Sequence, residues 1–274
     1  MVRDPERFFS ELKKKRVGVV GLGVSHFALI RLMLKKGIGV TVLDKREMEA
    51  LGEDGRTLEK EGARFILGDG YLDALTSFDV LFRTPGMYFL SDALNKARAA
   101  GVSVVSEMEV FFDLCPCRVF AVTGSDGKTT TSTLISEFFK AEGKTVHLGG
   151  NIGRALLPQI DEIKPEDICV VELSSFQLIS MRQSPDVAVV TNVAPNHLDV
   201  HRDMQEYIDA KKNILLHQNG FSRTVLNFEN TVTREEMAPL VRGELCWFSK
   251  ERPVENGSFL RGDGMLCRVR HGEA

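Results

Sequence analysis

The chain has 274 residues, of which 43% are hydrophobic, and its formal net charge at pH 7 is −3. This length and composition are typical of a globular protein and predict two domains. The slight negative charge provides no basic surface for a nucleic acid, so we expect any bound nucleotide to be a small molecule. No stretch reaches the roughly 18 apolar residues of a membrane span, and the first residues lack a signal-peptide run, which predicts a cytoplasmic protein without membrane insertion.

Strands and helices alternate along the first part of the chain. The expected strands lie at residues 16–20, 39–44, 63–67, 80–83 and 102–106. The expected helices lie at residues 5–16, 23–36, 56–61 and 91–100. This alternation predicts an α/β fold with a doubly wound, mostly parallel sheet, whose ligands gather at the carboxyl ends of the strands.

The first strand runs into a glycine turn, Gly21-Leu22-Gly23-Val24-Ser25, which is a candidate anion site. A dinucleotide fingerprint would place a third glycine at His26, whereas Asp44, at the end of the second strand, stands where a ribose-binding carboxylate would. Both NAD binding and a unit that binds nothing remain open. The run Thr84-Pro85-Gly86 would close over a ligand held by this turn, or form an ordinary turn.

A second α/β unit follows a boundary that we place between Asp113 and Arg118, giving domains at residues 1–115 and 116–274. Its expected strands lie at residues 119–123, 145–148, 168–172, 187–192 and 224–227. The run Arg261-Gly-Asp-Gly264 is predicted to be the turn of a hairpin.

The start of this unit is an apolar strand that breaks into a tight glycine turn and then enters a helix. Such a turn binds phosphate, because glycines let successive N–H groups curve round an anion and the helix N-terminus adds partial positive charge. Lys128 would supply an ammonium group and Thr129 a hydroxyl suited to Mg²⁺. The candidate phosphate-binding residues are Gly124, Ser125, Asp126, Gly127, Lys128, Thr129 and Thr130.

This motif is a partial match to a P-loop. The usual P-loop has glycine where Val122 stands, so the turn has a shorter Gly-x-x-Gly-Lys-Thr form. A strand-turn-helix junction with an exposed lysine is the alternative, but the flanking strand and helix favour nucleotide binding. We expect Asp126 to cap the helix and to take no part in catalysis.

Polar residues follow two later strands of the same unit. Glu172 ends one strand, where a Mg²⁺ ion bound to ATP phosphates needs a hard oxygen ligand, and His197 follows the next, with Asp199 near enough to orient it. Asn151 would bond substrate or phosphate, unless its neighbouring glycines only shape a loop. The pair Lys211-Lys212 by itself would be a solvated helix face.

Four runs, in this order, resemble the Mur ligases of bacterial cell-wall synthesis: residues 123–130, 149–153, 172–178 and 192–201. The run Glu-Leu-Ser-Ser-Phe-Gln from Glu172 is most similar to the members that add D-glutamate to UDP-N-acetylmuramoyl-L-alanine. Asp126 and Asn196 depart from the family, which often has a neutral and an acidic residue at these positions.

The resemblance implies a Rossmann-like UDP-binding domain, which replaces the NAD option, and a P-loop domain that binds ATP and Mg²⁺. The substrate-binding residues it implies are Leu22, Gly23, Val24, Ser25, Asp44, Lys45, Gly86, Asn151 and Ser174. Lys128 would neutralise phosphates, and the metal would be held by Thr129, Glu172, His197 and Lys211. Lys211 matches a lysine that the family carbamylates, and with Lys128 and His197 it completes the implied catalytic set.

The reaction implied is phosphorylation of the substrate's L-alanine carboxylate by ATP, followed by attack of the D-glutamate amine on the acyl phosphate. The family continues into a C-terminal amino-acid-binding domain, so we expect this chain alone to be a catalytically incomplete monomer. A non-catalytic UDP-sugar or nucleotide-binding module is one alternative. Another is a related Mur or folylpolyglutamate-type ligase.

Overall fold

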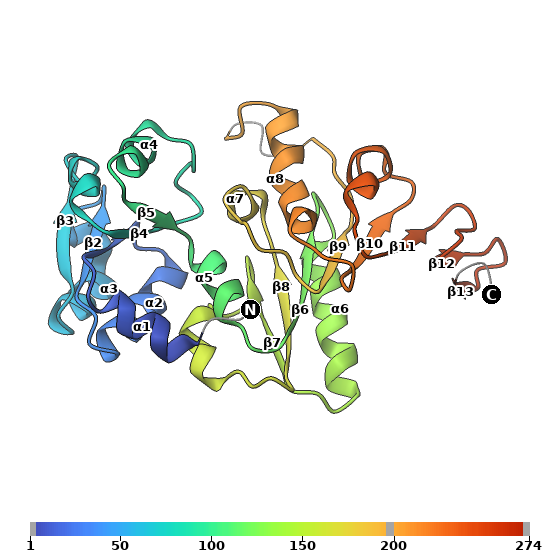
Figure 1. Ribbon diagram of the computed structural model, residues 1–274, viewed down its shortest axis with the longest axis horizontal. Coiled ribbons are helices and arrows are strands. Elements are labelled where there is room, and N and C mark those ends of the chain that lie inside the picture. Colours follow the sequence, from blue (N-terminus) through green and yellow to red (C-terminus); the bar gives the residue numbers. More distant parts are fainter. Residues whose placement is uncertain (1–3, 196–199, 271–274) are drawn as a thin grey trace. The chain divides into compact units, whose positions relative to one another are not determined.

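The computed structural model describes residues 4–195 and 200–270 (Figure 1). The chain divides into two compact units. The first comprises residues 1–115 and 154–162, and the second comprises residues 116–153 and 163–274. The short segment 154–162 thus lies with the first unit, although it was predicted to belong to the second domain.

The first unit contains a parallel five-stranded sheet in the order β3-β2-β1-β4-β5. Its strands are β1 (Val17–Val20), β2 (Val40–Asp44), β3 (Arg64–Leu67), β4 (Val80–Arg83) and β5 (Ser103–Val105). Its helices are α1 (Pro5–Leu12), α2 (Val24–Lys35), α3 (Met48–Lys60), α4 (Asp92–Ala99) and α5 (Glu107–Leu114), with the short turns η1 (Asp73–Ser77) and η2 (Leu157–Glu162). The predicted parallel α/β sheet is confirmed, with β1 at its centre.

Helix α5 was not predicted, and two of the predicted helices have clearly different bounds. Helix α3 begins at Met48, before the expected residue 56. The chain kinks at Gly52 (φ 65°), and the helix resumes beyond this residue. A glycine at positive φ inside a helix hides the helical pattern from the sequence. Helix α1 ends at Leu12, short of the expected residue 16.

The second unit contains an eight-stranded sheet in the order β13-β12-β11-β10-β9-β6-β8-β7. Its strands are β6 (Arg118–Thr123), β7 (Val146–Gly150), β8 (Ile168–Glu172), β9 (Val187–Val190), β10 (Arg223–Asn227), β11 (Glu244–Ser249), β12 (Gly257–Leu260) and β13 (Leu266–Val269). Its helices are α6 (Lys128–Ala141), α7 (Ser175–Leu178) and α8 (Met204–Leu216), with a short π-helix η3 (Thr233–Met237) and a short 3-10 helix η4 (Ala238–Leu240). All paired strands are parallel except β12 and β13, which form the predicted hairpin.

The register of this sheet positions the candidate site. Strand β6 lies between β8 and β9, and Val122 pairs with Glu172 on one side and with Val189 on the other. These central strands are buried, as is typical of a parallel sheet covered on both faces. The carboxyl ends of three strands therefore meet at one edge, where the glycine turn begins.

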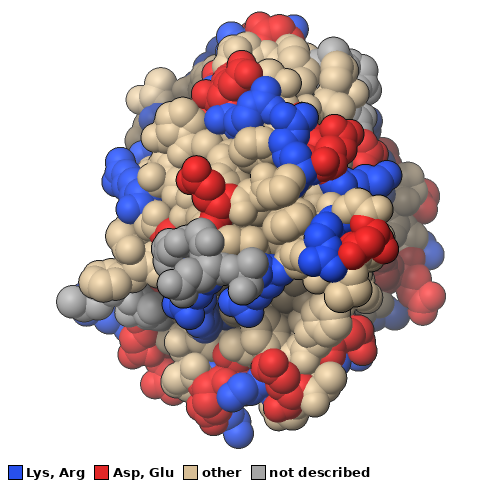
Figure 2. Space-filling model, turned by 90° about the vertical axis from the view of Figure 1, so that its right-hand side faces the viewer, with Lys and Arg blue, Asp and Glu red and all other residues tan. Residues whose placement is uncertain are grey.

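No helix in the described part of the chain has the length and hydropathy needed to cross a bilayer. On the face drawn in Figure 2, lysine and arginine side chains are interspersed with aspartate and glutamate. This face therefore carries a mixed charge and no broad field of one sign.

Candidate functional site

The glycine turn joins β6 to α6 in a conformation that needs its two glycines. Gly124 has a φ of +152°, and a Cβ there would overlap the Thr191 hydroxyl. Gly127 occupies the N-cap position of α6 with a left-handed φ of 77°. Both positions disfavour any other residue, so the conformation of this tight turn depends on its two glycines.

The tip of the turn is held by residues that follow β9. The Asp126 N–H donates to Asn192 Oδ1 (3.0 Å), and the Thr191 hydroxyl donates to the Asp126 carbonyl (2.6 Å). The expectation that Asp126 caps α6 is wrong, because Gly127 is the N-cap residue and the helix has no side-chain cap bond. Asp126 instead contributes its main chain, and its exposed side chain leaves the N-terminus of α6 open.

Lys128 folds back over the turn. Its Nζ donates to the carbonyl oxygens of Gly124 (3.0 Å) and Ser125 (2.9 Å). Thr129 and Thr130 follow in the first turn of α6 and are exposed. The first N–H groups of a helix have no intrahelical partner, so this end of α6 offers donors to an anion beside a mobile ammonium group.

Glu172 lies at the same sheet edge and is almost fully buried, with 1% of its surface exposed. The Thr129 hydroxyl donates to one of its carboxylate oxygens (2.7 Å), and the Asn151 amide donates to the other (2.8 Å). Three residues from three separate runs of the sequence thus meet around one carboxylate. Hydroxyl and carboxylate oxygens are the hard ligands that fit Mg²⁺.

Lys211 is buried behind the glycine turn, with 1% of its surface exposed. Its Nζ donates to the Gly124 carbonyl (3.0 Å) and lies 4.6 Å from the centre of the Tyr207 ring. Burial, followed by the charge of Lys128, lowers the pKa of Lys211 to about 7. The simple interpretation of the Lys211-Lys212 pair as a solvated face is therefore wrong for Lys211.

Two further predicted residues stand differently. Ser174 is the N-cap residue of α7, where its hydroxyl donates to Gln177 Oε1 (3.0 Å) and accepts from the Gln177 N–H (3.3 Å). His197 lies outside the described residues, as do Asn196 and Asp199.

The first unit carries a cavity of about 440 Å³ at the carboxyl ends of β1, β2 and β4. Among the residues that the family resemblance implies for substrate binding, Leu22, Gly23, Asp44, Lys45 and Gly86 line this cavity. Val24 and Ser25 are not among the residues that line this cavity and lie in the first turn of α2.

Asp44 uses its carboxylate within the protein. It accepts from the Leu22 N–H (2.7 Å), the Arg46 N–H (2.9 Å) and the Arg46 guanidinium (2.8 Å). Burial opposes its ionisation, but the hydrogen bonds from Arg46 and Leu22 prevail and lower the pKa of Asp44. Asp44 therefore shapes the glycine turn of this cavity.

His26, which replaces the third fingerprint glycine, anchors the same turn. The ring is fully buried, and its Nδ1–H donates to the Gly21 carbonyl (2.7 Å). Burial is the main cause that lowers the pKa of His26 to about 4, and the charge of Arg83 adds to it. A neutral imidazole thus stands under the turn.

Two family models match this chain. Residues 15–106 match the model described as Mur ligase MurD-like, N-terminal domain, and residues 122–250 match the Mur ligase middle domain. The chain belongs to the Mur ligase family.

Relatives of this Mur ligase chain include a UDP-N-acetylmuramoylalanine–D-glutamate ligase of Acetivibrio thermocellus, 49% identical over 95% of this chain and 56% of that protein. A ligase of the same name from Clostridium botulinum is 49% identical over 97% of this chain and 58% of that protein. The chain therefore spans a little over half the length of these relatives.

Solved Mur ligase structures share the fold. The crystal structure of UDP-N-acetylmuramate:L-alanyl-gamma-D-glutamyl-meso-diaminopimelate ligase from Neisseria meningitides aligns with a TM-score of 0.60 and 17% identity, covering 94% of this chain and 85% of that one. The UDP-N-acetylmuramate-alanine ligase of Thermotoga maritima aligns with a TM-score of 0.50 and 21% identity, covering 87% of this chain and 53% of that one.

Several residues at the two candidate sites were not predicted from the sequence. Arg46, Tyr71 and Met87 line the cavity of the first unit. Tyr207 lies behind the glycine turn, where its hydroxyl meets Ser125 Oγ at 2.9 Å. Tyr207 stands one helical turn before Lys211, and this spacing is the signal that would have found it.

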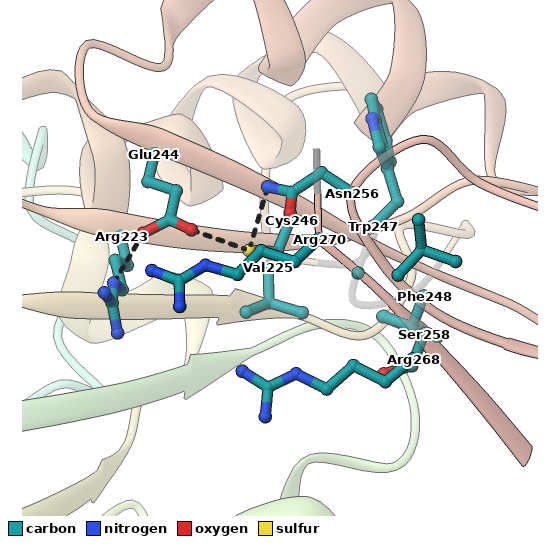
Figure 3. A pocket seen from close by; sticks show the side chains of 12 residues that line it. Arg223, Val225, Glu244, Cys246, Trp247, Phe248, Asn256, Ser258, Arg268 and Arg270 are labelled. Atoms are coloured by element: carbon teal, nitrogen blue, oxygen red, sulfur yellow. Dashed lines mark hydrogen bonds and ion pairs between the residues drawn. The ribbon is translucent and has the colours of Figure 1, made fainter. Parts of the chain in front are cut away.

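A second cavity of the Mur ligase chain, of about 250 Å³, lies on the strands at the far edge of the second sheet (Figure 3). Arg268 and Arg270 extend into it in the same direction, while Glu244 pairs with Arg223 at 2.7 Å and accepts from the Cys246 thiol. None of the residues that line it was predicted as a site residue.

Proposed function

We propose that this chain carries the UDP-substrate and ATP sites of a ligase that adds D-glutamate to UDP-N-acetylmuramoyl-L-alanine in peptidoglycan synthesis. The observation that carries the proposal is the meeting of Lys128, Thr129 and Glu172 at one sheet edge. The names and 49% identity of the relatives support the substrate assignment. We further propose a cytoplasmic monomer, with the UDP site in residues 1–115 and the ATP site in residues 116–274.

In the second unit, the side chains match the needs of a magnesium-bound triphosphate. Lys128 would exchange its two carbonyl partners for phosphate oxygens, and the open N-terminus of α6 would donate to the same phosphates. Thr129 and Glu172 would hold one Mg²⁺, and His197 would help to hold a second. When bound, Mg²⁺ spreads the negative charge that arises as a carboxylate approaches a phosphate.

Lys211 would contribute as a carbamate. Carbamylation requires an uncharged amine, which forms a bond to the carbon of CO₂ and releases a proton. A pKa of about 7 leaves a large share of Lys211 uncharged at neutral pH. The modified side chain is anionic and would supply a carboxylate-like oxygen ligand for Mg²⁺.

In the first unit, the N-terminus of α2 would receive the diphosphate. The Gly21 and Leu22 N–H groups already donate to the Leu43 carbonyl and to Asp44, so the donors left for an anion begin at Gly23 and continue through Val24 and Ser25. Lys45 and Gly86, with Asp44 behind them, would lie near the nucleoside.

The decisive experiment measures phosphate release from ATP with UDP-N-acetylmuramoyl-L-alanine, with and without D-glutamate. The chain is compared with the complete Acetivibrio thermocellus relative, and UDP-N-acetylmuramic acid, which lacks L-alanine, serves as the control substrate. Binding of UDP-N-acetylmuramoyl-L-alanine together with binding of ATP supports the proposal. Binding without any substrate-dependent ATP hydrolysis, in this chain and in the relative, would favour a nucleotide-binding module. Release that depends on a folate would favour a folylpolyglutamate-type ligase.

Replacing Glu172 with glutamine is expected to raise the Mg²⁺ concentration needed for ATP binding by about tenfold or more, because a charged oxygen ligand is lost. A Mg²⁺ titration of ATP binding by calorimetry measures the change. Glu166→Gln, on an exposed residue just before β8, is the matched control. An unchanged titration in Glu172→Gln would remove Glu172 from the ligand set.

A further inference from the structure

Glu107 is a buried carboxyl group that the proposed mechanism does not use. It is the first residue of α5, and only 7% of its surface is exposed. Its carboxyl group accepts hydrogen bonds from the Ser25 hydroxyl and from the Leu157 N–H. Its Oε1 atom is buried and has no hydrogen-bond partner among the described residues. Glutamate is rarely buried to this extent unless it is paired.

The start of α5 does not need this side chain as a cap. Ser106 and Glu109 already form a complete capping box there, with the Glu109 N–H donating to Ser106 Oγ and the Ser106 N–H donating to Glu109 Oε2. Burial of a carboxyl group costs free energy, and burial raises the pKa of Glu107 to about 7. In its buried position, the Glu107 carboxyl group forms the two hydrogen bonds with Ser25 and Leu157.

The two residues that Glu107 contacts, Ser25 and Leu157, lie in segments connected with the proposed sites. Ser25 lies in the first turn of α2, whose open N–H groups would meet the diphosphate. Leu157 begins η2, within the segment 154–162 that packs with the first unit. In the sequence this segment closely follows Asn151, whose side-chain amide donates a hydrogen bond to the Glu172 carboxylate. Glu107 thus links the N-terminus of α2 by hydrogen bonds to a segment that is distant in the sequence.

We propose that Glu107 is a positioning residue for the UDP-linked substrate, fixing the Ser25 hydroxyl and tying the diphosphate-binding turn to Leu157. The inference rests on the proposed function. A serine hydroxyl rotates readily, and a helix terminus at a surface frays. A group that holds both before the substrate arrives lowers the ordering cost of binding.

The test compares two variants that change Glu107 without opening a cavity. Glu107→Leu removes both contacts, and Glu107→Gln keeps them, because its amide can accept from the Leu157 N–H and donate to Ser25 Oγ. Calorimetry measures the Kd for UDP-N-acetylmuramoyl-L-alanine and, separately, for ATP with Mg²⁺. We expect Glu107→Leu to weaken binding of the UDP-linked substrate about tenfold, because the Ser25 hydroxyl and the turn would then have to be ordered when the substrate binds. Its Kd for ATP should not change, and Glu107→Gln should stay within about threefold of the original chain.

Two further arms separate positioning from simple support of the fold. Glu59→Ala, on an exposed residue of α3, is the control for loss of a glutamate. In a double-mutant cycle, Ser25→Ala and Glu107→Leu should be clearly non-additive, because one acts through the other.

Several outcomes would overturn the inference. These are equal substrate affinity in the original chain and Glu107→Leu, additive effects in the cycle, or an equal loss of ATP affinity. If Glu107→Leu does not fold, a Glu107→Gln variant that binds the substrate as weakly as Ser25→Ala overturns it as well. A chain that does not bind UDP-N-acetylmuramoyl-L-alanine at all contradicts the proposed function itself. Tight substrate binding with the same Kd in the original chain and in Glu107→Leu contradicts this inference alone.

Discussion

Replacing Lys128 with alanine should abolish ATP binding and phosphoryl transfer while leaving the binding of UDP-N-acetylmuramoyl-L-alanine intact. The Lys128 ammonium lies over the glycine turn, and its hydrogen-bond partners among the described residues are the main-chain carbonyls of Gly124 and Ser125, so it is available to phosphate oxygens. Lys211 cannot replace it, because its Nζ is buried, already donates to the Gly124 carbonyl, and has a pKa that burial lowers to about 7. Removing a preorganised donor to developing negative charge typically costs about 10²- to 10³-fold in rate.

Calorimetry with each ligand and phosphate release from ATP measure these effects. Lys140→Ala, on an exposed lysine near the other end of α6, is the matched control, since within the described part of the chain it loses an ion pair with Glu137. If Lys128→Ala lost both ligands equally, the assignment of one ligand to each unit would be wrong.

The convergence of Lys128, Thr129 and Glu172 was predictable because it follows from local rules. Alternating strands and helices specify a parallel sheet, and the carboxyl ends of its strands share an edge. The pairing of Val122 with Glu172 then brings the end of β8 beside the glycine turn. Neither step depends on side-chain packing, so the sequence was sufficient.

The remaining features depend on tertiary contacts that carry no local signal. Asp126 looks like a helix cap in the sequence, but Thr191 and Asn192, which follow the distant strand β9, form hydrogen bonds with its main chain. Lys211 looks solvated beside Lys212, yet α8 turns it inward under the glycine turn. Glu107 reads as an ordinary acidic residue in a first helical turn, and only the fold reveals its burial.

Glu107 and His26 should make the stability of the first unit respond to pH in opposite directions. The pKa of Glu107 is about 7 in the folded chain against a usual value of 4.5, so between these values the folded state binds more protons than the unfolded state. Stability then falls as pH rises through this range. The pKa of His26 is about 4 against 6.5, so the unfolded state binds more protons there and stability rises with pH.

These two effects oppose each other between about pH 4.5 and 6.5, and each has a magnitude on the order of 3 kcal/mol. We therefore expect Glu107→Gln, which cannot ionise, to match the original chain at pH 4 and to exceed its unfolding free energy by about 3 kcal/mol at pH 8. His26→Gln should give the opposite difference, gaining stability relative to the original chain only as pH falls below 6.5.

Urea unfolding at a series of pH values, followed by circular dichroism, measures both differences. Trp247, the single tryptophan of the chain, lies in β11 of the second unit, so its fluorescence reports on a part that neither substitution touches. If the difference in unfolding free energy between Glu107→Gln and the original chain stays constant from pH 4 to pH 8, the buried carboxyl group does not titrate near neutrality. The pH dependence must then come from other groups, and the burial of Glu107 would have to be relieved by solvent that reaches its Oε1 atom.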